Sequence, residues 1–268
     1  MEIGIPAEVK NNEYRVGATP SMVEILTEAG HKVKVQRDAG RKIGFSNEQY
    51  QSAGAEVVST AAEVYASEMI VKVKEPQASE YSLLKKGQIL FCYLHLAPDP
   101  VQTAELIEKE VVAIGYETVT DARGKLPLLI PMSEIAGRIS IQVGATYLQM
   151  NHGGKGLLLG GVPGVLPSYV TIIGGGVVGT QAARMALGLG ARVAVVDSDL
   201  NRLREIDDLY GPPIRTVFST PQNIEELVAA SDLVIGSVLL PGKTAPKLIT
   251  RKMIQRIDRK STRLNSSH

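Results

Sequence analysis

Short apolar runs alternate along the chain with segments of helical periodicity, and glycines stand between many of them. The first clear pair is a helix over 22–29, preceded by Thr19 as N-cap and Pro20 in its first turn, and a strand over 32–36. The same order continues, and it predicts strands at 3–5, 32–36, 56–58, 69–73, 88–94 and 111–116 and helices at 22–29, 47–53, 61–66 and 101–110. Helices that alternate with short β-branched strands are typical of a parallel α/β sheet.

A second α/β region follows a long predicted helix over 133–150. The stretch GKLPLLIP before this helix marks a domain boundary, and a new buried-strand run starts at Tyr169. We therefore expect two domains: an N-terminal substrate domain over 1–130 and a Rossmann-type doubly wound parallel sheet over 131–257.

The final segment, residues 258–268, breaks the apolar helical pattern that runs to Ile257. It is polar, and one choice of codons for DRKSTRLNSSH spells a sequencing-library adapter throughout. A genuine polar tail is the alternative, but we expect a translated adapter, which would make the chain a fragment whose Rossmann domain is incomplete. An interrupted sheet has an open strand edge, so we also expect the 268-residue chain to be inactive and to dissolve poorly.

The strongest motif is a glycine-rich turn between a predicted strand over 169–173 and a helix over 180–189. Gly174, Gly176 and Gly179 fit the pattern G-x-G-x-x-G, in which glycines permit a tight turn, close approach to a pyrophosphate and close helix–strand packing. Asp197 ends the next strand, where its carboxylate can bind ribose hydroxyls and repel a 2′-phosphate. This order of elements predicts NAD as the cofactor, and a purely structural glycine turn is the alternative.

Composition and charge exclude several classes of protein. With 44% hydrophobic residues the chain can form cores, and 29 Lys and Arg against 28 Asp and Glu lack the basic excess of a nucleic-acid binder. The single cysteine, Cys92, fits a reducing compartment, and no signal peptide begins the sequence. The uncharged segment 156–183 contains too many glycines for a membrane helix and predicts loops around a buried strand.

Three polar residues follow or flank predicted strands of the first domain: Arg15, Lys74 and His95. An arginine or a lysine can bind a carboxylate, and a histidine can move protons near neutral pH. Taken singly, each is more typical of an ordinary surface side chain, so residue chemistry alone does not select them.

Residues 1–257 resemble the family of alanine dehydrogenases and transhydrogenase alpha subunits. The resemblance rests on GIPAEVKNNEYRVGATP, VKVKEP, FCYLHLAPD and LPSYVTIIGGGVVGTQAARMALGLGARVAVVD. It implies reversible, NAD-dependent oxidative deamination of L-alanine to pyruvate and ammonia by a cytoplasmic homohexamer, with no metal, nucleic-acid or membrane partner.

By this resemblance Arg15 and Lys74 bind the substrate and His95 transfers protons. The positions that match cofactor contacts are Ser133, Val177, Val178, Asp197, Arg202, Ser219, Val238 and Leu239. A further catalytic aspartate of the family, expected soon after Ile257, is absent from this sequence. Two alternatives stay open: an NAD(H)-binding module like the transhydrogenase alpha subunit, and a lysine- or saccharopine-type dehydrogenase.

Overall fold

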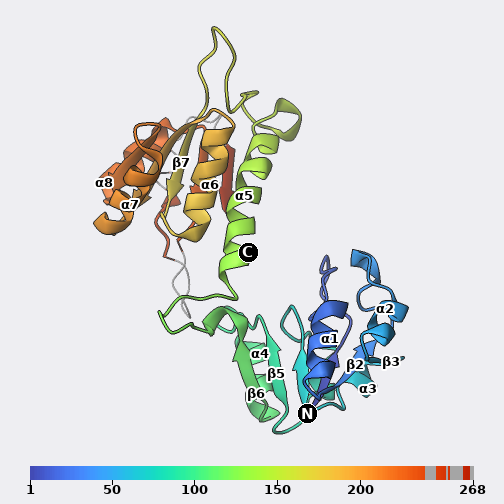
Figure 1. Cartoon of the computed structure of the whole chain (residues 1–268). Helices are drawn as coiled ribbons and strands as arrows, with labels where there is room; N and C mark the ends of the chain where they lie inside the picture. Colours follow the sequence, from blue (N-terminus) through green and yellow to red (C-terminus); the bar gives the residue numbers. More distant parts are fainter. Residues whose placement is uncertain (239–245, 252, 254–261, 266–268) are drawn as a thin grey trace. The chain divides into compact units, whose positions relative to one another are not determined.

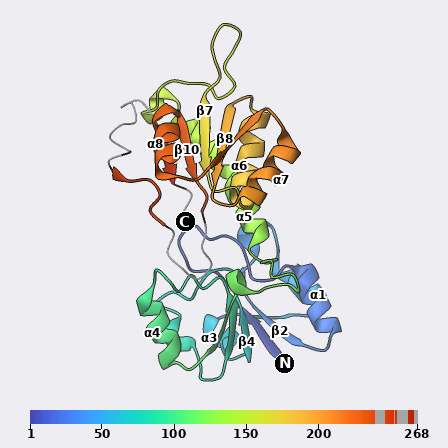
Figure 2. The ribbon, with the colours of Figure 1, turned by 90° about the vertical axis from the view of Figure 1, so that its left-hand side faces the viewer.

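The computed structural model of the chain describes residues 1–238, 246–251, 253 and 262–265. The chain divides into two compact units, of which the first spans Met1–Leu128 and the second begins at Leu129. Each unit is built on a parallel sheet with helices on both faces (Figures 1 and 2). The α/β fold class predicted from the sequence is therefore confirmed.

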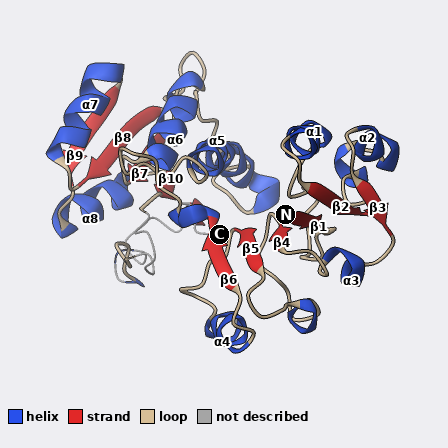
Figure 3. Ribbon diagram, turned by 60° about the horizontal axis from the view of Figure 1, so that its bottom comes forward, coloured by secondary structure: helices blue, strands red, loops and turns tan. Residues whose placement is uncertain are grey.

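The first unit contains a six-stranded sheet in the order β3-β2-β1-β4-β5-β6. Its elements are β1 (Glu2–Ile5), α1 (Pro20–Glu28), β2 (Lys32–Gln36), η1 (Arg41–Ile43), α2 (Asn47–Ser52), β3 (Glu56–Val58), α3 (Ala61–Val64), β4 (Met69–Val71), η2 (Tyr81–Leu83), β5 (Ile89–Cys92), α4 (Pro100–Glu108), β6 (Val112–Gly115) and η3 (Tyr116–Thr118). Helices α1 and α2 cover one face of the sheet, and α3 and α4 cover the other (Figure 3). Every helix and strand predicted for this part of the chain is present.

Two hydrophobic clusters hold the helices of the first unit to its sheet. Val23 of α1 and Tyr50 of α2 pack with Val33 and Val35 of β2 in one cluster, whereas the other cluster includes Leu106 of α4. The predicted start of α1 is also confirmed, since the Thr19 side chain accepts a hydrogen bond from the Met22 amide and so caps the helix. The order of the elements and their faces thus follows from the apolar pattern.

The second unit contains a five-stranded parallel sheet in the order β11-β10-β7-β8-β9. Its elements are α5 (Ile130–Tyr147), η4 (Met150–His152), β7 (Tyr169–Ile173), α6 (Val177–Gly188), β8 (Arg192–Asp197), α7 (Leu200–Tyr210), β9 (Ile214–Phe218), α8 (Pro221–Ala230), β10 (Leu233–Gly236) and β11 (Thr262–Asn265). Buried side chains of α5, α6 and α7 share one hydrophobic cluster, and those of α8 belong to a second. This arrangement is a doubly wound sheet.

Glycines allow α5 to lie unusually close to its neighbours. A Cβ on Gly137 would lie 2.3 Å from the Val178 carbonyl oxygen of α6, and a Cβ on Gly144 would lie 2.5 Å from Cδ2 of Leu233 in β10. The two glycines are seven residues apart and therefore share a helix face. Ser133 lies one turn before Gly137 on the same face of α5.

The tail segment differs from expectation in one respect. The sequence predicts an open strand edge in the interrupted sheet, whereas the structure pairs Thr262–Asn265 with β10 in parallel over Leu233–Gly236. An open edge presents unpaired N–H and C=O groups that accept any extended segment within reach. The pairing therefore does not reveal the origin of residues 258–268, and the adapter interpretation stays a prediction.

The uncharged segment 156–183 forms loops, strand β7 and the start of α6. Its loop part extends from the second unit as a narrow hairpin, closed by a bridge between Val162 and Val165 (Figure 1). Within the described part of the chain, no helix is both long enough and apolar enough to cross a membrane.

Candidate active site

The three residues predicted to act on substrate follow strands of the first sheet. β1 and β4 are neighbours at its centre, and the chain proceeds outward from them in opposite directions, so their carboxyl ends form a topological switch point. Arg15 lies in the loop after β1, Lys74 lies three residues beyond β4, and His95 lies three residues beyond β5. The structure brings all three to the same edge of the sheet.

Close packing joins the loop of Arg15 to the end of β4. Gly17 approaches this strand so closely that a Cβ on it would lie 2.3 Å from the Val71 carbonyl oxygen. The positive charge of Lys74 contributes to lowering the pKa of Glu13, which lies two residues before Arg15. Arg15 in turn lies near enough to Tyr93 for their charges to interact.

Glu13 sets the orientation of the Arg15 side chain. Its carboxylate accepts hydrogen bonds from Arg15 Nε at 2.8 Å and from Nη2 at 2.6 Å, and a third from the Arg15 amide at 2.9 Å. Burial by itself raises the pKa of Glu13, but the hydrogen bonds from Arg15 outweigh it and the net shift is downward. Glu13 is therefore an ionised partner of Arg15, and the sequence analysis missed it.

Glu8 holds the turn that carries Lys74. Its Oε1 accepts a hydrogen bond from the Val73 amide at 2.6 Å. The Lys74 side chain is half-buried, and no carboxylate of the described residues lies within ion-pairing distance of its ammonium group. The backbone beside Lys74 is thus fixed by Glu8, and the Lys74 ammonium forms no ion pair within the described residues.

Lys72, two residues earlier, has a different environment although both lysines belong to the segment VKVKEP. It is fully buried, with its Nζ 2.7 Å from Glu80 Oε1 and 3.5 Å from Glu8 Oε2, and the Tyr65 hydroxyl donates to the same Glu80 oxygen. Burial raises the pKa of Glu8, and the positive charge of Lys72 opposes that rise. Lys72 therefore has a structural role. Only its burial distinguishes it from Lys74, since both lysines occur in the same sequence motif.

His95 is exposed at the sheet edge. Its ring stacks on that of Tyr93 with 6.0 Å between centroids and 17° between planes. Burial raises the pKa of Tyr93 and Arg15 opposes the rise, and the Tyr93 hydroxyl donates to the Leu128 carbonyl oxygen at 2.5 Å. Strand β5 ends at Cys92, earlier than the predicted end at residue 94, and His95 itself has a left-handed backbone with φ of 50°. The imidazole is thus oriented by an aromatic ring and is accessible for proton transfer.

The glycine turn of the second unit has the geometry that its motif predicts. Gly174 has φ of 104°, and a Cβ on Gly179 would lie 1.8 Å from the Gly174 carbonyl oxygen, so neither position accepts a side chain. A Cβ on Gly176 would meet nothing within 4 Å, which leaves open space at the N-terminus of α6. Helix α6 begins at Val177 and not at residue 180 as predicted, because Gly176 acts as its N-cap. The amides of Val177 and Val178 therefore lie in the first turn, where N–H groups lack helical partners.

Asp197 and Arg202 both bind this turn. Asp197 Oδ2 accepts from the Gly175 amide at 2.6 Å and Oδ1 accepts from the Asp199 amide at 2.9 Å. Arg202 donates through Nε to the Gly175 carbonyl oxygen and through Nη2 to Thr180 Oγ1, both at 2.6 Å. Arg202 matches a cofactor contact by resemblance. In this structure its side chain links the glycine turn to the start of α6 through these two hydrogen bonds.

Ser219 and Val238, two further predicted cofactor positions, lie at or near the carboxyl edge of the second sheet. Ser219 follows β9, and its amide donates to the Asp197 carbonyl oxygen at 2.9 Å. Val238 follows β10, and its Cγ2 would lie 3.0 Å from a Cβ on Gly174. Leu239 lies outside the described residues. The glycine turn, Asp197, Ser219 and Val238 are thus gathered around the switch point between β7 and β10.

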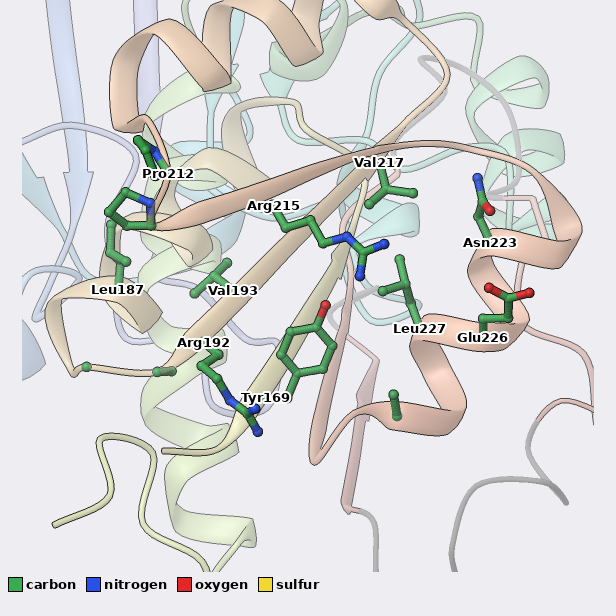
Figure 4. Close-up of a pocket in the computed structure, with 14 residues that line it drawn as sticks. Tyr169, Leu187, Arg192, Val193, Pro212, Arg215, Val217, Asn223, Glu226 and Leu227 are labelled. Carbon is green, nitrogen blue, oxygen red and sulfur yellow. The ribbon is translucent and has the colours of Figure 1, made fainter. Parts of the chain in front are cut away.

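An open pocket of about 840 Å³ lies at the other end of the strands of this sheet (Figure 4). Tyr169, Arg192 and Arg215 line it at the amino ends of β7, β8 and β9, and Glu226 lines it from α8. Ligands of open α/β sheets bind beyond the carboxyl ends of the strands. The pocket is therefore separate from the glycine turn and does not locate the cofactor.

Comparison with known families assigns both units. Residues 4–136 match the model described as alanine dehydrogenase/PNT, N-terminal domain, and residues 140–262 match the corresponding C-terminal domain. The chain belongs to the alanine dehydrogenase/PNT family. Membership of this family confirms the resemblance found in the sequence.

Comparison with individual proteins supports the same family assignment. The chain is 53% identical over 256 residues to an alanine dehydrogenase of Methanococcus maripaludis, an alignment that covers 95% of this chain and 69% of the relative. It is 52% identical over 257 residues to an alanine dehydrogenase of Bacillus subtilis, covering 96% and 68%.

Two solved structures of this family resemble the fold. An L-alanine dehydrogenase matches with a TM-score of 0.90 and 48% identity, covering 99% of this chain and 73% of that one. A transhydrogenase from Sinorhizobium meliloti matches with a TM-score of 0.79 and 24% identity, covering 98% and 77%. At that identity the transhydrogenase match shows the fold alone.

Proposed function

We propose that the protein to which this chain belongs, expressed from its complete reading frame, acts as an alanine dehydrogenase, an NAD-dependent oxidoreductase that interconverts L-alanine with pyruvate and ammonia. The observation that carries the proposal is the 52–53% identity to alanine dehydrogenases over 95–96% of the chain, which extends across both units. The side chains at the two sheet edges would supply the chemistry that this reaction needs.

The second unit fits a dinucleotide. Gly176 leaves room for a pyrophosphate at the N-terminus of α6, where the amides of Val177 and Val178 would donate to it. Asp197 would accept hydrogen bonds from the ribose hydroxyls, because each carboxylate oxygen has lone pairs beyond those that bind Gly175 and Asp199. Its charge disfavours a 2′-phosphate, which favours NAD over NADP. Bound NAD supplies the acceptor for the hydride that leaves the alanine Cα.

The first unit would hold and orient the amino acid. The Lys74 ammonium would contact the substrate carboxylate, and Arg15 would contribute positive charge from the orientation that Glu13 imposes. Two cations beside one carboxylate restrict how the substrate lies, and correct orientation is itself a large contribution to rate.

His95 would move the protons of the reaction. In the direction of deamination, water adds to the imine carbon, and the imidazole transfers protons from that water to the departing amine. Its exposed ring, stacked on Tyr93, can exchange a proton at one nitrogen without rearrangement of the backbone. General acid–base catalysis of this kind contributes typically about 10²–10⁴-fold to rate.

A module like the transhydrogenase alpha subunit is the weaker candidate. The match to the transhydrogenase structure has half the sequence identity of the alanine dehydrogenase match, 24% against 48%. A module that passes hydride between nucleotides also has no use for a cationic pair and a histidine at the edge of a separate sheet. The homohexamer implied by the resemblance stays a prediction, which light scattering can test.

The test is the substrate requirement of NADH oxidation by the protein expressed from its complete reading frame. We expect oxidation only when pyruvate and ammonium are both present, and NAD reduction with L-alanine in the reverse direction. Oxidation with pyruvate alone, or hydride transfer to a second nucleotide without either substrate, would contradict the proposal.

A further inference from the structure

We propose that Glu117 is a positioning residue for His95, holding the backbone that carries the imidazole; the inference rests on the function proposed above. Glu117 lies in η3, directly after β6, and His95 lies beyond the neighbouring strand β5. Nothing in the sequence singles out Glu117, because the two residues are 22 positions apart.

The Glu117 carboxylate binds two consecutive backbone amides. Its Oε1 accepts from the His95 amide at 2.7 Å and from the Leu94 amide at 3.1 Å, and Oε2 lies 3.2 Å from the same Leu94 amide. Hydrogen bonds to an ionised acceptor are shorter and stronger than those between neutral groups. The segment that ends in His95 is therefore held by a carboxyl side chain from η3, which follows the adjacent strand β6.

The backbone of His95 needs such an anchor. Its φ of 50° is in the left-handed region, which a residue with a Cβ adopts only when its surroundings enforce it. If the Leu94 and His95 amides lost their acceptor, the residue could relax to a right-handed or extended conformation. The direction of the Cα–Cβ bond would then change, and with it the position of the imidazole.

Glu117 is itself held in place by the sheet. Cys92 of β5 is paired with Gly115 of β6, so the residues after these two strands are neighbours. A Cβ on Gly115 would lie 3.1 Å from Glu117 Oε2, so the absence of a side chain at Gly115 leaves room for the carboxylate.

A cluster of aromatic rings orients the imidazole of His95. Tyr116, which precedes Glu117, packs edge-on against Phe91 and Tyr93 with centroid distances of 4.3 and 5.0 Å. Tyr93 in turn stacks on the His95 ring. Tyr116 thus contacts the ring of His95 through Tyr93, whereas Glu117 binds the His95 main chain directly.

A double-mutant cycle tests this assignment in the protein expressed from its complete reading frame. Glu117→Gln keeps one acceptor oxygen and loses the charge, and we expect kcat to fall about 10-fold, or about 100-fold for Glu117→Ala, since displacement of a catalytic group by an ångström costs about that much. The NADH dissociation constant is expected to stay unchanged. In the His95→Ala background the same substitutions should lower kcat less than 2-fold, because the residue on which Glu117 acts is gone.

Two further variants make the result decisive. Gly115→Ala crowds the carboxylate without removing it and should reproduce the loss of kcat if the Glu117 variants fail to fold. Glu110→Gln, whose exposed carboxylate pairs with Lys86, is the matched control and should leave kcat unchanged. An unchanged kcat in the Glu117 and Gly115 variants, or an equal fall in both histidine backgrounds, overturns the inference. Absence of pyruvate- and ammonium-dependent NADH oxidation in the unmutated protein would instead overturn the proposed function.

Discussion

The Asp197 carboxylate accepts a hydrogen bond from the Gly175 amide at 2.6 Å, so the acid at the end of β8 also supports the glycine turn after β7. In the proposed function the same side chain would support the pyrophosphate site and bind the ribose. Its substitution should change cofactor choice as well as affinity.

For Asp197→Asn we expect the preference for NADH over NADPH to fall at least about 10-fold, because the charge that repels a 2′-phosphate is removed. Fluorescence titration with both cofactors measures the ratio of dissociation constants. Asp207→Asn, on the exposed surface of α7, is the control and should leave the ratio unaltered. An unaltered ratio in Asp197→Asn would show that this residue does not select the cofactor.

Two glycines of the turn should respond differently to alanine. At Gly176 a methyl group meets nothing within 4 Å, so Gly176→Ala should change the free energy of unfolding by less than about 0.5 kcal/mol while weakening NADH binding at least about 10-fold. At Gly179 the methyl group would lie 1.8 Å from a carbonyl oxygen, and the loss of stability should be about 1–3 kcal/mol or more.

Thermal unfolding and NADH titration of the two variants separate these effects. We expect NADH binding to change without a change in stability in Gly176→Ala, and both to change in Gly179→Ala. Unimpaired NADH binding by Gly176→Ala would show that the pyrophosphate does not bind at Gly176.

His95→Ala should lower kcat by about 10²–10⁴-fold, because the proton-transferring group is lost while the cofactor turn is unaffected. Steady-state assays with pyruvate and ammonium measure kcat, and the NADH dissociation constant should change less than 2-fold. His152→Ala, at an exposed position in η4, serves as the control. Near-normal turnover by His95→Ala would exclude this histidine from the reaction.

The ion pair of Glu13 and Arg15 should stabilise the protein in a pH-dependent manner. The pKa of Glu13 in the folded state lies below its ordinary value of 4.5, so the stabilisation is complete above that pH and is lost as the pH falls through the folded-state pKa. Glu13→Gln should therefore lower the free energy of unfolding by about 1–3 kcal/mol at pH 7, and the difference should shrink progressively below pH 4.5.

Urea denaturation at a series of pH values, followed by circular dichroism, provides the measurement. Glu108→Gln, an exposed residue of α4, should be neutral at every pH. A difference between wild type and Glu13→Gln that persisted unchanged in acid would mean that the carboxylate charge does not contribute.

Hydrophobic pattern and glycine spacing were sufficient to predict most of the fold. The run from Tyr169 to Asp197 specifies strand, turn, helix and strand by local rules alone, and each element is present. The ends were harder to place, because Gly176 caps α6 three residues earlier than the helical pattern indicates. Helices α7 and α8 and strand β9 were not predicted individually, since no motif marked that part of the chain.

The site was only partly predictable, for a physical reason. Arg15, Lys74 and His95 reach one sheet edge because parallel strands end together, which the order of elements implies. Glu13 and Glu117 act through distances and hydrogen bonds that no residue pattern encodes. Lys72 and Lys74 differ only in burial, and burial depends on the complete tertiary structure.

The most direct test of the central claim follows the hydride itself. The protein expressed from its complete reading frame is incubated with NADH deuterated at the transferable C4 position, pyruvate and ammonium, and the products are analysed by mass spectrometry. We predict one deuterium at Cα of alanine and none in lactate. Deuterium in lactate, or in a second nucleotide with no labelled alanine, would contradict the assignment of this chain as an alanine dehydrogenase.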